Sequence, residues 1–193
     1  MADPLVVGGF LVLAAPSEPP AFSKRFAMRQ ITDSALQPTP VRASTTDDPT
    51  DLLSFAVDAF RKGRVALATL VEVRGGAARA LGSQIAVTSD GRFCGYVSGG
   101  CVEAAVAAEA LLAIAEGRDR LAKFGEGSPF FDIVLPCGGG ISVAIHVVRD
   151  PQPLCRVLDR LGDREAVGLR YSPQQQSLWP TPSDLAPWMS RFR

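Results

Sequence analysis

The sequence predicts an α/β fold of the α+β kind, in which helices pack on a mixed β-sheet that contains hairpins. Two observations support this fold class. β-Prone runs recur along the middle of the chain, the clearest being "RVALATLVEVR" at 64–74. Two other segments, 51–63 and 102–116, have the apolar content and spacing of helices. The 193 residues suffice for a single domain with a substantial core.

The first 50 residues are predicted to be a disordered leader or linker, because 16–50 is rich in Pro, Ser, Thr and Asp. An apolar run at 5–15 is too short to span a bilayer, and no Lys or Arg precedes it. Neither a membrane anchor nor a secretory signal is therefore expected. The folded domain is predicted to occupy 51–172.

Within the domain, a hairpin is predicted where two β-prone runs meet at Asp90-Gly91, a strong turn signal. The helix at 102–116 follows and is expected to end at Gly117, since glycine suits the residue after a helix. The remaining elements are strands at 121–125, 130–136 and 141–148 and a weaker helix at 153–162. The segment 173–193 is predicted to be an irregular tail.

Charge and cysteine usage exclude several functions. Lys plus Arg and Asp plus Glu both number 20, so no net positive field favours nucleic acid or an anionic membrane. The four cysteines form no C-x-x-C pair, and there is one histidine, so zinc knuckles and thioredoxin-type motifs are absent. Dispersed thiols in a chain of this length are typical of a reducing cytosol, and a cytoplasmic location is predicted.

The stretch "YVSGGCVEAAV" (96–106) is the first candidate site. Gly99 and Gly100 allow close approach to the backbone, and the start of a helix favours phosphate or a thiolate. Cys101 in that first turn is expected to favour its thiolate form. Because the helix is apolar nearly all round, it is predicted to be buried, with its N-terminus facing a packed site. The alternative is a tight turn with a small buried cysteine.

Glu103 lies on the other side of this helix from Glu109 and Glu116, which are expected to face water. It must therefore find another partner. Glu103 is a candidate site residue, and capping of the first helical turn is the alternative role.

The stretch "PCGGGIS" (136–142) repeats this chemistry, with Cys137, Gly138 and Gly139 following a predicted strand. It matches neither a Walker A loop nor a dinucleotide fingerprint. If the two loops converge, they provide two soft sulfur ligands for a metal and backbone donors for an anion.

Three further residues are expected to be structural. His146 lies opposite the apolar face of its strand and is predicted to be a satisfied structural histidine. Cys94 and Cys155 are predicted to be packing residues. A single histidine also gives little support for a Ser-His-Asp hydrolase.

These motifs resemble the N-terminal domain of the XdhC/CoxI family. The resemblance covers about residues 52–170, and "SGGCVE" (98–103) is its most specific part. Members are accessory proteins of xanthine dehydrogenase and related molybdenum hydroxylases, including carbon monoxide dehydrogenase. They bind the molybdenum cofactor, a molybdopterin, help it acquire its terminal sulfur, protect it and deliver it to the apo-enzyme.

The resemblance therefore implies a maturation chaperone in preference to a catalyst. The expected partners are an apo molybdenum hydroxylase and, as a further candidate, a cysteine desulfurase, with no nucleic acid and no membrane; a homodimer is also expected. Cys101 and Cys137 would be ligands of the metal. The cofactor-binding residues it implies are Ser98, Gly99, Gly100, Cys101, Glu103, Cys137, Gly138 and Gly139.

The sequence departs from the family pattern in two places. No glycine fingerprint follows residue 150, so a C-terminal Rossmann domain and NAD(P) binding are not expected. The loop "RGGAARALGS" (74–83) lacks the proline often found there. Two other functions stay open: a thiol-dependent oxidoreductase using Cys101, with Cys94 or Cys137 as resolving thiol, and a scaffold that binds no cofactor.

Overall fold

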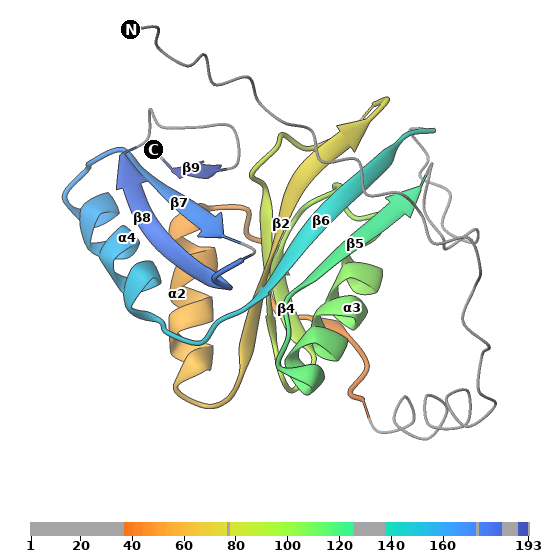
Figure 1. Cartoon of the computed structure of the whole chain (residues 1–193), viewed down its shortest axis with the longest axis horizontal. Coiled ribbons are helices and arrows are strands. Elements are labelled where there is room, and N and C mark those ends of the chain that lie inside the picture. Colours follow the sequence, from red (N-terminus) through yellow and green to blue (C-terminus); the bar gives the residue numbers. More distant parts are fainter. Residues whose placement is uncertain (1–36, 77, 126–137, 173, 183–188, 193) are drawn as a thin grey trace, which may run out of the picture. The chain divides into compact units, whose positions relative to one another are not determined.

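The predicted α/β fold class is confirmed by the structure, a computed structural model (Figure 1). It describes residues 37–76, 78–125, 138–172, 174–182 and 189–192. The elements in chain order are β1 (Val41–Arg42), α2 (Pro49–Phe60), β2 (Val65–Arg74), β3 (Gln84–Thr88), β4 (Arg92–Gly95), α3 (Glu103–Glu116), β5 (Arg120–Gly125), β6 (Gly140–Val147), α4 (Gln152–Gly162), β7 (Val167–Ser172), β8 (Ser177–Pro182) and β9 (Met189–Phe192). No helix among these residues has the length and apolarity needed to cross a bilayer.

Six strands form a mixed sheet in the order β1-β4-β3-β2-β6-β5. β1 pairs with β4 in parallel, and every other pair in this sheet is antiparallel. The hairpin predicted at Asp90-Gly91 joins β3 to β4. A register shift between Leu70 and Glu72 marks a bulge in β2. A second, antiparallel sheet has the order β8-β7-β9.

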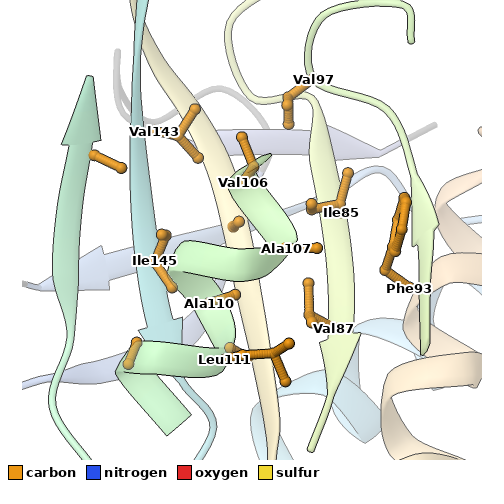
Figure 2. Close-up of a cluster of buried hydrophobic side chains, with 14 of the residues drawn as sticks. Ile85, Val87, Phe93, Val97, Val106, Ala107, Ala110, Leu111, Val143 and Ile145 are labelled. Carbon is orange, nitrogen blue, oxygen red and sulfur yellow. The ribbon is translucent and has the colours of Figure 1, made fainter. Parts of the chain in front are cut away.

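The two faces of the six-stranded sheet carry separate apolar clusters. Side chains alternate between faces along each strand, so Ala66 and Ala68 contribute to one cluster and Val65 and Leu67 to the other. Figure 2 shows α3 covering the first face, with Val106 and other helix side chains over β3 and β6. On the other face α2 packs against β3 and α4, and α4 packs against β7 and β8. Each fully buried Val, Leu, Ile or Phe side chain contributes about 1.5–3 kcal/mol.

The start of α2 and the end of α3 have local causes. Asp48 precedes α2 and accepts hydrogen bonds from the N–H groups of Thr50 and Asp51. α3 ends at Gly117, whose φ of 66° is left-handed, as predicted.

The prediction that α3 is buried on all sides is wrong. One side of α3 lies on the sheet, whereas Ala104 and Ala115 on its other side are exposed. Alanine makes the helix read as apolar all round, but its single methyl group needs no core position.

Three strands lie in segments predicted to be a disordered leader or an irregular tail. β1 lies within the first 50 residues, and β8 and β9 lie in 173–193. Pro180 obscures β8 in the sequence pattern, but β8 is an edge strand, where a missing N–H is tolerated. The strand predicted at 130–136 lies outside the described residues.

Candidate functional site

Three loops lie together at one end of the strands of the six-stranded sheet, which is called the sheet edge below. β4 ends at Gly95, β2 ends at Arg74, and β6 begins at Gly140 beside that end of β2. The Cys101 loop, defined here as residues 96–102, and the β2–β3 loop, defined as residues 75–83, therefore leave the sheet at the edge where Gly138 and Gly139 enter it.

Close contacts join these loops. A Cβ at Gly139 would lie 2.4 Å from the carbonyl oxygen of Arg74 and 2.6 Å from that of Gly76, so only glycine fits there. A Cβ at Gly99 would lie 3.3 Å from the Cβ of Ala78. The β2–β3 loop thus lies against both the Cys101 loop and Gly139.

The carboxylate of Glu103 organises the Cys101 loop. Its Oε1 accepts from the N–H groups of Val97 (3.0 Å), Ser98 (2.8 Å) and Gly99 (3.1 Å). Its Oε2 accepts from the N–H of Gly100 (2.9 Å) and the hydroxyl of Ser98 (2.8 Å). Glu103 is 1% exposed. Glu103 therefore serves neither as a solvent-facing ligand nor as a cap within the helix, but binds the loop that precedes the helix.

Ser98 completes the hydrogen bonding of this loop. Its Oγ accepts from the N–H groups of Cys101 and Val102, both at 3.1 Å. All six N–H groups from residue 97 to residue 102 thus have acceptors inside the chain. This differs from the predicted cradle, in which the N–H groups of Gly99 and Gly100 bind an external anion. The two glycines are needed instead for φ values of +86° and +117°.

Two opposing effects act on the charge of Glu103. Burial raises the pKa of its carboxyl, but the hydrogen bonds from Ser98 and Val97 outweigh burial and hold the pKa below the ordinary value of 4.5. The charged form is therefore the one the loop is built around.

Cys101 lies at the exposed tip of this loop with a free thiol. Gly99 and Gly100 beside it are also exposed. The prediction of a packed site at the helix N-terminus is therefore wrong, and so is the alternative of a small buried cysteine. The loop presents an accessible thiol on a backbone whose donors are all occupied.

Cys94 and Cys155 behave as packing residues, as predicted. Cys94 is 0% exposed, and burial raises the pKa of its thiol to about 11. Burial thus removes Cys94 as the resolving thiol of an oxidoreductase. Cys155 is half-buried in α4, and Cys137 lies outside the described residues. Within the described ranges, no three His, Cys, Asp or Glu side chains gather as a metal site.

Two arginines flank Tyr96, the first residue of the Cys101 loop. The guanidinium carbon of Arg42 lies 4.4 Å from the centre of the Tyr96 ring, and that of Arg79 lies 5.0 Å from it. Arg42 also donates to the carbonyl of Gly95 (3.0 Å), and Arg79 pairs with Asp47 (3.0 Å). This group was not predicted from the sequence. Its one sequence signal is Arg79 in the unusual "RGGAARALGS" loop.

A second buried polar cluster surrounds Asp119, just after α3. Its Oδ2 lies 2.7 Å from Nδ1 of His146 and accepts from the hydroxyl of Tyr171 (2.8 Å). Its Oδ1 accepts from Arg149 (2.9 Å) and from the N–H of Val147 (3.0 Å). His146 is thus a buried, hydrogen-bonded residue, which confirms its predicted structural role.

A shallow hollow of about 410 Å³ lies on the three-stranded sheet. None of the predicted site residues lines it. The residues that line it are Arg170, Ser172, Gln175, Trp179, Pro180 and Thr181.

Comparison with known proteins identifies the class of protein. Residues 60–125, which include the Cys101 loop, match the model of the XdhC and CoxI family. This part of the chain is of the XdhC and CoxI family, which confirms the resemblance found in the sequence.

Two individual proteins are similar to the chain. It is 61% identical over 140 residues, 72% of the chain, to the molybdenum cofactor insertion chaperone PaoD of Escherichia coli (strain K12). It also matches the crystal structure of a protein described as a xanthine dehydrogenase from Bacillus halodurans, with a TM-score of 0.54 and 26% identity over 65% of the chain. The chain spans less than half of each relative, 44% of the first and 39% of the second.

Proposed function

We propose that this protein is an accessory chaperone that binds the molybdenum cofactor and inserts it into a molybdenum hydroxylase. The similarity to PaoD supports the insertion role. The observation that carries the proposal to particular residues is the accessible thiol of Cys101 at the tip of a hydrogen-bonded loop. The proposed client enzyme is of the xanthine dehydrogenase or carbon monoxide dehydrogenase type. The protein is further proposed to help sulfurate and protect the cofactor and to act in the cytoplasm.

The residues at the sheet edge fit one end of this cofactor better than the other. The cofactor supplies a molybdenum–sulfur centre and a phosphate. The thiol of Cys101 is a soft ligand suited to the molybdenum–sulfur centre. The N–H groups of Gly99 and Gly100 are not available to the phosphate, because they already donate to Glu103.

Side-chain cations beside the loop are the better candidates for the phosphate. The guanidinium groups of Arg42 and Arg79 lie against Tyr96, and a guanidinium recognises phosphate through paired N–H donors. The side chain of Arg79 is 32% exposed and forms an ion pair with Asp47. Gly138 and Gly139 are proposed to shape the opposite side of the site, with Cys137 as a second thiol.

In this role the residues of the chain hold the cofactor and do not catalyse a reaction. For a thiol-dependent oxidoreductase, burial removes Cys94 as the resolving thiol and leaves Cys137 in that role. A cysteine desulfurase is the proposed source of sulfur, and association of two copies of the chain is also proposed.

The test is the molybdenum and pterin content of protein purified from a cofactor-producing host. The chain is expected to carry both in near-equal amount, and Cys101→Ala is expected to carry neither. Cys155→Ala, which alters a half-buried thiol in α4, is the matched control and is expected to retain the cofactor. Well-folded wild-type protein without cofactor, or equal content in Cys101→Ala, would contradict the proposal.

A further inference from the structure

The tip of the Cys101 loop is held in an unusual way for an exposed segment. Val97 and Val102 anchor its two ends in the core that α3 covers. Between them, Gly99, Gly100 and Cys101 are all exposed and bury no large side chain. Hydrogen bonds are therefore what fixes the conformation of the tip.

Those bonds converge on one carboxylate. A buried carboxylate persists only where its oxygens are fully hydrogen-bonded or paired with a cation. Within the part of the chain that the structure describes, the hydrogen-bond partners of Glu103 are uncharged: the N–H groups of residues 97–100 and the Ser98 hydroxyl. Successive N–H groups that point inward form an anion-binding concavity, and here the anion belongs to the chain itself.

We propose that Glu103 is a positioning residue whose carboxylate, as an internal anion, fixes the loop that presents the Cys101 thiol. The inference rests on the proposed function for its purpose, since the fixed thiol is the proposed cofactor ligand. The geometry itself does not depend on that function. Glu103 acts through the loop and does not touch the cofactor.

The amide of glutamine separates this role from simple space-filling. Glu103→Gln keeps the volume and shape of the side chain but replaces one acceptor oxygen by an NH₂ donor. Either Oε2 or Oε1 is lost as an acceptor, which leaves the donors of Gly100 and Ser98, or of Val97, Ser98 and Gly99, facing another donor. A space-filling role predicts no effect of this change.

Amide hydrogen exchange of the full chain, followed by NMR, is the first measurement. In the wild type, the N–H groups of Gly99 and Gly100 are expected to be protected although both residues are exposed. Glu103→Gln is expected to exchange at these positions roughly tenfold faster or more, because bonds to a carboxylate are lost. The matched control is Glu116→Gln, an exposed position of the same helix, and is expected to leave both rates unchanged.

Chemical rescue is the second measurement. Glu103→Ala vacates the concavity, so added formate is expected to restore the protection of Gly99 and Gly100, whereas chloride is not. Exchange in Glu103→Gln equal to the wild type would overturn the proposal, as would a folded Glu103→Ala that does not respond to formate. Global unfolding of Glu103→Gln, seen by circular dichroism, would also overturn it, because the carboxylate would then serve overall stability.

Cofactor content links the inference to the function. Folded Glu103→Gln is expected to retain at least tenfold less molybdenum than Glu116→Gln. Wild-type protein without cofactor would refute the proposed function while the exchange data still decide the role of Glu103. Normal cofactor content together with accelerated exchange would overturn the positioning role alone.

Discussion

Ser98 and Glu103 share the hydrogen bonding of a short exposed loop. Ser98 is a donor to the carboxylate and an acceptor for two following N–H groups. Neither role is visible in the sequence, where the family resemblance implies that Ser98 binds the cofactor. The contacts instead make it a second support for the position of Cys101.

Replacement of this serine tests that support. Ser98→Ala leaves the buried N–H of Val102 and the N–H of Cys101 without their acceptor, so the free energy of unfolding is expected to fall by about 1–3 kcal/mol. Urea denaturation measures the change. Ser44→Ala, which removes a similar but exposed acceptor, is the control and is expected to change stability by less than about 0.5 kcal/mol. Equal effects of the two substitutions would contradict the account.

Gly139 is restricted by space and not by its backbone angles. Gly139→Ala would place a methyl group 2.4 Å from the Arg74 carbonyl oxygen, so the β2–β3 loop must move. A loss of about 1–3 kcal/mol in the free energy of unfolding is expected from such overpacking. Gly162→Ala is the control, since nothing lies within 4 Å of the added methyl there. Thermal unfolding of both variants checks the difference, and an unaffected Gly139→Ala would refute the close packing.

β6 and β7 belong to different sheets and meet at Asp119. The carboxylate of Asp119 binds His146 in β6 and Tyr171 in β7, and the ring centres of these two residues are 5.2 Å apart. Burial raises the pKa of Tyr171, and the hydrogen bond to Asp119 raises it further. Burial alone would raise the pKa of Asp119, but the contacts with His146, Tyr171 and Arg149 hold it well below 3.8.

This joint predicts an acid-dependent loss of stability. Because the pKa of Asp119 is lower in the folded chain than in the unfolded chain, its contribution is complete above about pH 4 and is lost as pH falls from 3.8 through the folded value. Asp119→Asn is expected to destabilise the protein by about 3 kcal/mol at pH 7. The difference from the wild type is expected to shrink below pH 3.8. Urea denaturation from pH 7 to pH 2.5 tests this, and a difference independent of pH would contradict it.

The elements that the sequence predicted best have strong local signals. The hairpin at Asp90-Gly91, the end of α3 at Gly117 and the strand β2 all follow from turn chemistry, capping and β-propensity. β8 was missed because its prolines contradict the usual strand pattern. Only its place at the edge of a sheet makes them tolerable, and sheet order is a property of the whole fold.

Some features of the candidate site could likewise be predicted from the sequence, and others could not. The sequence pointed to Gly99, Gly100, Cys101 and Glu103 as one group, and Glu103, at the start of α3, does bind the loop that holds the other three. It could not show which of them faces a ligand, because that depends on where each N–H donates. Arg42 and Arg79 reach Tyr96 from separate segments, so no sequence spacing links them.

At the level of the whole molecule, one end of the six-stranded sheet holds the groups proposed to form the site. They are the thiol of Cys101, the glycine pair Gly99 and Gly100, and the guanidinium groups of Arg42 and Arg79. The match to the XdhC and CoxI family covers the Cys101 loop, and the chain spans 44% of PaoD. The central claim is that this chain of 193 residues holds the cofactor by itself, through Cys101.

Anaerobic titration of the purified chain with isolated molybdenum cofactor, followed by pterin fluorescence, tests that claim most directly. The account predicts saturable binding at one cofactor per chain and at least tenfold weaker binding by Cys101→Ala, with Cys155→Ala like the wild type. Equal affinity of the wild type and Cys101→Ala would contradict the account.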